Sequence, residues 1–203
     1  MKYSNMFFEI YAMLSLCKYF NLSEKKMQKT ERPDWIYDEQ KIGIEVTRAI
    51  PSRWAQFDNM VEEYIFNKED DQNFLKHEIP GYIDDSYKRA AYVPGEDELD
   101  LKIVLDELIN RIAIKEHKKE KYIECNENWL YVFAATCMIN EYEIGRLIKK
   151  IEHVYDKIFI NTQDKIFLVN IDRVVDIISL SDKDMKNLRK DTFARHKTYE
   201  EFY

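Results

Sequence analysis

The sequence predicts an α+β fold in which helices flank a central mixed β-sheet, and three observations lead to this prediction. Several long stretches keep a helical apolar period, and the chain contains only four glycines and four prolines. A β-hairpin pattern occupies residues 32–49. An apolar strand, a helix and a second hairpin follow after residue 128. With 203 residues, of which 45% are hydrophobic, we expect a single domain over residues 1–203.

The first predicted element is a helix over residues 5–20, with Ser4 or Asn5 as its N-cap. Glu9 lies among its apolar residues, and as a first-turn acid it would complement the helix dipole. We expect a polar linker over residues 22–32. The apolar stripe of the helix consists of Met6, Ile10, Met13, Leu14 and Cys17.

Residues 32–49 are expected to form two short strands around a polar turn, with Asp34 on the first strand and Glu45 in the second. If the strands pair, both carboxylates converge on one hard cation, because Mg²⁺ is usually held by one or two carboxylates and water. In a purely structural interpretation, Asp34 caps a turn after Pro33, and Glu45 is a partly exposed strand residue that pairs with a basic side chain of a neighbouring strand. Strand alternation puts Ile42, Ile44 and Val46 on an apolar face and Lys41, Gly43, Glu45 and Thr47 on the other.

The middle of the chain is predicted to be a helical insertion of about residues 53–122 between the second and third core strands. It contains a helix over 53–77, a loop or lid over 82–100, and a second long helix over 99–122. That helix ends in the basic cluster Lys115–Lys121, which fits either a phosphate contact or an ordinary solvated helix end. Its inward residues are expected to be Ile103, Leu105, Leu108, Ile109 and Ile112.

The residue pattern of the last third of the chain predicts the remaining strands of the sheet and two more helices. Residues 129–135 are apolar on both faces, which is typical of a central strand covered on both sides. A helix is expected over 140–155, and strands over 157–161 and 165–171 form a hairpin. A short helix begins near Ser181, which stands at capping-box distance from Asp184.

The dipeptide Pro33-Asp34, followed by Glu45-x-Thr47 on a strand, resembles the PD-(D/E)xK nuclease superfamily, which has the restriction-endonuclease-like fold. The resemblance implies a core of helix, three strands, helix and strand. It also implies a Mg²⁺ or Mn²⁺ ion held by Asp34, Glu45 and the backbone carbonyl of Val46. Thr47 departs from the pattern, since the family has a lysine at this position.

The resemblance also gives Glu9 a second interpretation, because many members carry an acidic residue on the first helix that reaches the metal site. A threonine can donate a hydrogen bond but carries no charge, so another basic residue would have to replace the lysine. The candidates by reach are Lys41, Arg48, Arg53, Lys115, Lys118 and Lys119.

Two functions from different classes follow. The first is a metal-dependent nuclease that hydrolyses phosphodiester bonds in DNA or another nucleic acid, with Asp34, Glu45, Thr47 and Glu9 in the catalytic site. The second is a nuclease-fold protein that has lost catalysis and binds a protein partner as a regulatory module. An unrelated helical α+β protein with incidental carboxylates is a third interpretation. A homodimer is compatible with each.

The net charge, the cysteines and the apolar stretches of the sequence exclude some classes of protein. The net charge of −7 and pI near 5.3 argue against a general nucleic-acid coat protein but allow a nuclease with a local basic patch. The three scattered cysteines, Cys17, Cys125 and Cys137, predict reduced thiols and a cytoplasmic location. No stretch approaches 18 uncharged apolar residues, so we expect no membrane span.

Overall fold

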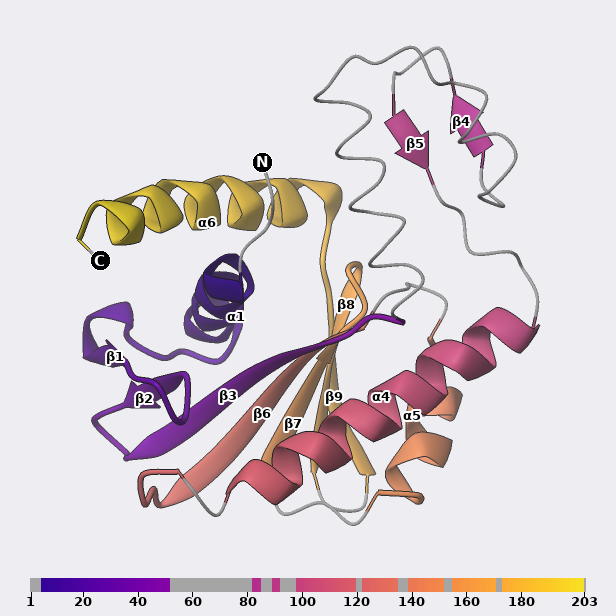
Figure 1. The fold of residues 1–203 in the computed structure, drawn as a ribbon, viewed down its shortest axis with the longest axis horizontal. Helices are drawn as coiled ribbons and strands as arrows, with labels where there is room; N and C mark the ends of the chain where they lie inside the picture. The colour runs from indigo at the N-terminus through magenta and orange to yellow at the C-terminus, as the bar shows by residue number, and fades with distance from the viewer. Residues whose placement is uncertain are drawn as a thin grey trace.

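A seven-stranded mixed β-sheet and four α-helices make up most of the part of the chain that the structure describes (Figure 1). A separate two-stranded sheet consists of β4 (Tyr82–Asp84) and β5 (Arg89–Ala91), which pair antiparallel. The computed structural model describes residues 5–51, 82–84, 89–91, 98–119, 122–134, 139–151, 155–170 and 173–202.

The strand order of the large sheet is β1-β2-β3-β6-β7-β8-β9. The pairs β3–β6 and β6–β7 are parallel, and all the other neighbours are antiparallel. Each parallel pair is joined by a stretch that contains a helix, as parallel connections require. The strands are β1 (Met27–Lys29), β2 (Trp35–Tyr37), β3 (Ile42–Ala49), β6 (Glu127–Ala134), β7 (Lys157–Asn161), β8 (Lys165–Asn170) and β9 (Arg173–Ser179).

Helices cover both faces of this sheet, so the molecule has three layers (Figure 1). On one face lie α4 (Glu98–Lys118) and α5 (Glu141–Ile148), and on the other lies α1 (Asn5–Tyr19). The fourth helix, α6 (Asp182–Phe202), packs along α1, where the Phe7 and Phe193 rings are 4.9 Å apart.

A hydrophobic core lies on each face of the sheet, and successive residues of a strand belong alternately to one core and the other. On β6, Leu130 and Val132 belong to the core under α4 and α5, whereas Trp129 and Tyr131 belong to the core under α1. This confirms that the apolar stretch around 129–135 is a central strand buried on both faces. Each core buries more than a dozen side chains, and α4 contributes Val104, Leu108 and Ile112 to the first. Val104 was not among the inward residues that the sequence predicted for this helix.

Most other predicted elements are confirmed, with shifts at their ends. The helix predicted over 5–20 is α1, the hairpin over 32–49 is β2 and β3, and the later hairpin is β7 and β8. The predicted capping box at Ser181 is present, because the Asp184 backbone N–H donates to Ser181 Oγ at 3.2 Å and the Ser181 backbone N–H donates to Asp184 Oδ2 at 3.4 Å. The helix predicted over 140–155 ends earlier, at Ile148. The helix predicted over 53–77 lies outside the described residues.

Two predictions about connections are wrong. The polar linker over 22–32 contains a short 3-10 helix (Glu24–Lys26) and strand β1, which pairs with β2. The loop predicted over 82–100 contains β4 and β5. Strand β9 was not predicted at all, and only a short helix was predicted where α6 has 21 residues. Three-residue strands are too short to show a period of two, so only their pairing partners define them.

Within the described residues, no helix combines the length and apolar character needed to cross a membrane. Cys17 and Cys125 are both free thiols, and Cys137 lies outside the described residues.

We predict that Gly43→Ala and Gly145→Ala change stability in opposite directions. A Cβ atom at Gly43 on β3 would lie 2.9 Å from Pro33 Cγ and 3.0 Å from Cys125 Sγ, so it overpacks the sheet. We expect this change to destabilise by about 1–3 kcal/mol. A Cβ at Gly145 in α5 meets nothing within 4 Å, so alanine there should stabilise by about 1 kcal/mol through helix propensity. Urea denaturation of both variants measures the difference, and equal effects would contradict the packing around Gly43.

Candidate functional site

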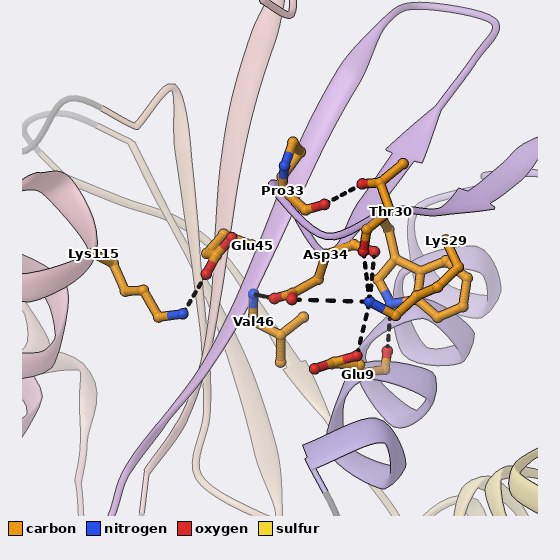
Figure 2. Close-up of polar contacts among 9 residues, drawn as sticks. Glu9, Lys29, Thr30, Pro33, Asp34, Glu45, Val46 and Lys115 are labelled. Carbon is orange, nitrogen blue, oxygen red and sulfur yellow. Dashed lines mark hydrogen bonds and ion pairs between the residues drawn. The ribbon is translucent and has the colours of Figure 1, made fainter. Parts of the chain in front are cut away.

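The site forms beside the part of β3 that extends beyond its pairing with the shorter strand β2. The last β2–β3 pair is Trp35 with Ile44, and β3 continues to Ala49 without a β2 residue beside it. At this edge the Asp34 carboxylate replaces a strand, because its Oδ2 accepts the Val46 backbone N–H at 2.7 Å. A buried backbone donor needs an acceptor, so this bond fixes the Asp34 side chain against the edge of β3 (Figure 2).

The turn before β2 presents Asp34 to that edge. The Thr30 backbone N–H donates to the Asp34 carbonyl at 3.0 Å, and the Thr30 hydroxyl donates to the Pro33 carbonyl. The Pro33 ring is buried, in contact distance of Gly43. The purely structural interpretation, in which Asp34 only caps the turn after Pro33, is therefore wrong, since its carboxylate bonds to β3 instead.

Glu45 points to the α4 face of the sheet and is only 5% exposed. Its Oε1 accepts a hydrogen bond from Lys115 Nζ of α4, so the long helix does pass over the site (Figure 2). Its Oε2 is buried and has no hydrogen-bond partner among the described residues. The structural interpretation of Glu45 as a partly exposed residue paired with a neighbouring strand is wrong in both respects.

Two tyrosines complete the surroundings of this ion pair. The Tyr155 hydroxyl donates to the Lys115 carbonyl at 3.2 Å, which ties the last turn of α4 to the segment before β7. The Tyr122 hydroxyl is buried and, within the described part of the chain, forms no hydrogen bond. Burial, followed by the Glu45 charge, raises the pKa of Tyr122. Tyr122 therefore remains a neutral phenol close to Glu45.

A second ion pair lies on the opposite, α1 side of the sheet. Lys29 Nζ is 3.0 Å from Glu9 Oε2 and 4.0 Å from Asp34 Oδ1. The Glu9 carbonyl accepts the indole N–H of Trp35 at 3.0 Å, so α1 is fixed to the start of β2. Glu9 is not a first-turn residue, because α1 as described begins at Asn5 with no acid in its first turn. The dipole interpretation of Glu9 is therefore wrong.

Asp34 lies between the two ion pairs, and its electrostatic environment is unfavourable for a negative charge. Burial, then the neighbouring carboxylates Glu45 and Glu9, raise the pKa of Asp34 to about 7. The Val46 N–H and the Lys115 ammonium act in the opposite direction but do not compensate. At neutral pH the carboxyl group is therefore close to half-protonated, and a cation beside it would stabilise the charged form.

The residues present fit a hard cation with few protein ligands. Asp34 and Glu45 supply carboxylate oxygens whose charges interact, and Glu45 Oε2 is a buried acceptor with no protein donor in the described structure. The N–H and carbonyl of one strand residue face the same neighbour, so the Val46 carbonyl shares the edge where its N–H meets Asp34. The described residues contain no group of three or more His, Cys, Asp or Glu side chains suited to a metal. This excludes an all-protein cage there, but Mg²⁺ and Mn²⁺ need only one or two carboxylates.

Of the predicted site residues, Asp34 bonds to Val46 and lies within electrostatic reach of Glu9 and Glu45, which lie on opposite faces of the sheet, while Thr47 stands apart from these contacts. Thr47 is half-buried on β3, where it pairs with Val132 of β6, and alternation puts it on the α4 face with Glu45. The hydrogen bonds and ion pairs given above for the site do not include its hydroxyl.

Of the described basic residues considered as replacements for a lysine at position 47, Lys115 contacts a predicted site carboxylate, and the others lie elsewhere. Lys115 reaches Glu45, whereas the Arg48 guanidinium lies 4.1 Å from the Phe8 ring centre on the α1 side. Lys118 is exposed, Lys119 lies over the Tyr155 ring at 5.7 Å, and Lys41 belongs to the β2–β3 turn. Arg53 lies outside the described residues.

Sequence reasoning missed Lys29, Tyr122 and Tyr155. Lys29 was assigned to a linker, and only the pairing of β1 with β2, which sets Lys29 opposite Trp35, reveals its direction. The two tyrosines lie in short irregular segments before β6 and β7, where no periodicity identifies the direction of a side chain.

Comparison of the chain with known protein families, with curated protein sequences and with solved structures found no match.

We predict that Asp34→Asn stabilises the metal-free protein at pH 8 and has little effect near pH 4. The pKa of Asp34 is about 7 in the folded protein, against about 3.9 in an unfolded chain. Between these values the unfolded chain has lost the proton that the folded state keeps, so stability falls as pH rises and levels off above 7. The pKa difference corresponds to at most about 4 kcal/mol. Asparagine keeps an oxygen for the Val46 N–H and removes the charge.

Urea denaturation of both proteins in EDTA, from pH 4 to 8, measures this effect. A difference between variant and wild type that is independent of pH would contradict the raised pKa of Asp34.

Proposed function

We propose that this protein is a Mg²⁺- or Mn²⁺-dependent nuclease that hydrolyses phosphodiester bonds in DNA. The observation that carries the proposal is that Asp34 is bonded to the free edge of β3 within electrostatic reach of Glu45, whose buried Oε2 has no hydrogen-bond partner among the described residues. The fold gives coarser support, because α1, the β1-β2-β3 meander, α4 and β6 follow in the order that the nuclease resemblance implies. The restriction-endonuclease-like fold itself is part of the proposal.

In the proposed reaction, one water molecule is added across a P–O ester bond. The water oxygen bonds to phosphorus, the ester bond breaks, the attacking water gives up a proton and the leaving oxygen takes one up. The products are a phosphate monoester and a hydroxyl group. When bound, a divalent cation offsets the charge on the reacting phosphate and lowers the pKa of a bound water.

The chain's own groups prepare the site for this reaction. Asp34 and Glu45 would hold the cation, with the Val46 carbonyl on the same strand edge as a third oxygen. The Val46 N–H holds Asp34 Oδ2 in place, and the Lys115 ammonium holds Glu45 Oε1. Glu9 and Lys29 form the wall on the α1 side, where Lys29 also binds the turn that presents Asp34. Thr47 would offer a hydroxyl but no charge on the α4 face.

We predict that wild-type protein with Mg²⁺ or Mn²⁺ cleaves plasmid or single-stranded DNA, and that Asp34→Asn or Glu45→Gln lowers the rate at least about 100-fold. Both changes keep the shape and remove an anionic ligand. Glu31→Gln is the matched control, because Glu31 is exposed in the segment before Asp34 and loses the same charge. Gel-based cleavage rates with and without EDTA measure the effect. Equal rates in wild type and both site variants would exclude these carboxylates from the reaction.

A second candidate function is a nuclease-fold module that has lost catalysis and acts by binding a protein partner. The observation that favours it is that Lys29 and Lys115 already pair with Glu9 and Glu45. In this case the lysines take the place of a cation, and the site stabilises the fold instead of performing a reaction.

Thermal melting distinguishes the two candidates. For the nuclease we predict that millimolar Mn²⁺ raises the melting temperature of the wild type by several degrees, because a ligand that binds only the folded state stabilises it. Asp34→Asn should abolish the rise, and Glu31→Gln should keep it. A melting temperature that does not respond to Mn²⁺, together with a specific protein partner, would favour the binding module.

A further inference from the structure

Two lysines bring ammonium groups to the carboxylates, and they differ in how many of their hydrogen-bond donors are in use. An ammonium group has three N–H donors and no acceptor. Lys29 Nζ lies 2.8 Å from the Thr30 carbonyl, 3.1 Å from the Asp34 carbonyl and 3.0 Å from Glu9 Oε2. All three donors are therefore committed, and Lys29 serves to hold α1 and the turn before β2 together.

Lys115 has donors to spare. Among the described residues its Nζ has one acceptor, Glu45 Oε1, which leaves two N–H groups. Its side chain is 19% exposed, so the charge lies in a largely dry environment, where contact with an anion is stronger than in water. The position of Lys115 is fixed as well, since the Tyr155 hydroxyl binds its carbonyl. An anionic oxygen arriving beside Glu45 would meet a positioned, charged donor.

The position of Thr47 on β3 shows how a lysine of α4 could supply the positive charge that position 47 lacks. Thr47 lies on the same face of β3 as Glu45, about 6.6 Å further along the strand. This is the face that α4 covers and from which Lys115 approaches Glu45. A side chain at position 47 and the side chain of Lys115 therefore both lie on the α4 face of β3, the first carried by the strand and the second by the helix.

We propose that Lys115 is the catalytic lysine of this protein and donates to a non-bridging oxygen of the phosphodiester beside Asp34 and Glu45. This inference rests on the proposed nuclease function. The ammonium keeps its three protons throughout, so no bond to it forms or breaks. Its charge offsets the negative charge that builds up on the phosphate as water adds and the ester bond breaks.

Lys115→Gln tests the proposal, with Lys118→Gln as the matched control on the exposed face of the same helix. The amide can still donate to Glu45, but the positive charge is gone. We expect kcat to fall at least about 100-fold, with KM changed by less than about fivefold. The Mn²⁺-induced rise in melting temperature should remain, because the carboxylates are intact. Lys118→Gln should stay within about twofold of wild type in all three measurements.

Restoring the charge from the strand gives a second and independent test. Adding Thr47→Lys to Lys115→Gln should recover at least about tenfold of the lost kcat, which a merely structural role for Lys115 would not allow. If Lys115→Gln does not fold, Lys115→Arg takes its place. Because arginine retains the charge, its kcat should stay within about tenfold of wild type.

Three results would overturn the proposal. Cleavage by Lys115→Gln at the wild-type rate would remove Lys115 from the reaction and leave the nuclease function standing. Loss of the Mn²⁺ response in Lys115→Gln would show that the lysine acts only through the cation site. Absence of metal-dependent cleavage by the wild type would overturn the nuclease function and, with it, the role of Lys115.

Discussion

The Val46 backbone N–H on β3 needs an acceptor, and this need determines the arrangement of the whole site. β2 begins only at Trp35, which pairs with Ile44, so no residue of β2 lies beside Val46 to accept the bond, and the Asp34 carboxylate does so at 2.7 Å. The bond draws a carboxylate into the interior beside Glu45 and Glu9, where its pKa rises to about 7. The crowding of negative charge is thus a consequence of satisfying one backbone group at the point where the sheet narrows.

The positive charges that compensate the carboxylates of the site come from the two helical layers on either side of the sheet. Lys29 approaches from the α1 side and Lys115 from α4, so two ammonium groups face three carboxylates across the sheet. Because each lysine is attached to a different element, the site depends on the packing of both helical layers. Asp34, in the plane of the sheet, lies within electrostatic reach of groups from both layers, and burial and the neighbouring carboxylates raise its pKa.

The sequence allowed the strongly patterned elements and the carboxylates to be predicted, for physical reasons that differ from residue to residue. The stretch around Tyr131 is apolar on both faces, as a central strand covered on both sides requires. The hairpin pattern predicted that the strand of Glu45 pairs with the strand that follows Asp34. Lys29 escaped prediction because β1 has three residues and is defined only by its partner. The burial of Glu45 depends on α4, which begins more than fifty residues later in the chain, and no local pattern reports such a contact.

The Glu45–Lys115 contact joins positions 70 residues apart, and this separation has a consequence for the order of synthesis and folding. During translation, Asp34 and Glu45 leave the ribosome long before α4 and β6, which must pack on β3 before the lysine meets the glutamate. Contacts between distant segments form late, because the chain between them must first be ordered. A nascent or partly folded chain therefore carries the carboxylates without the complete site, and the site comes into existence only with the native protein.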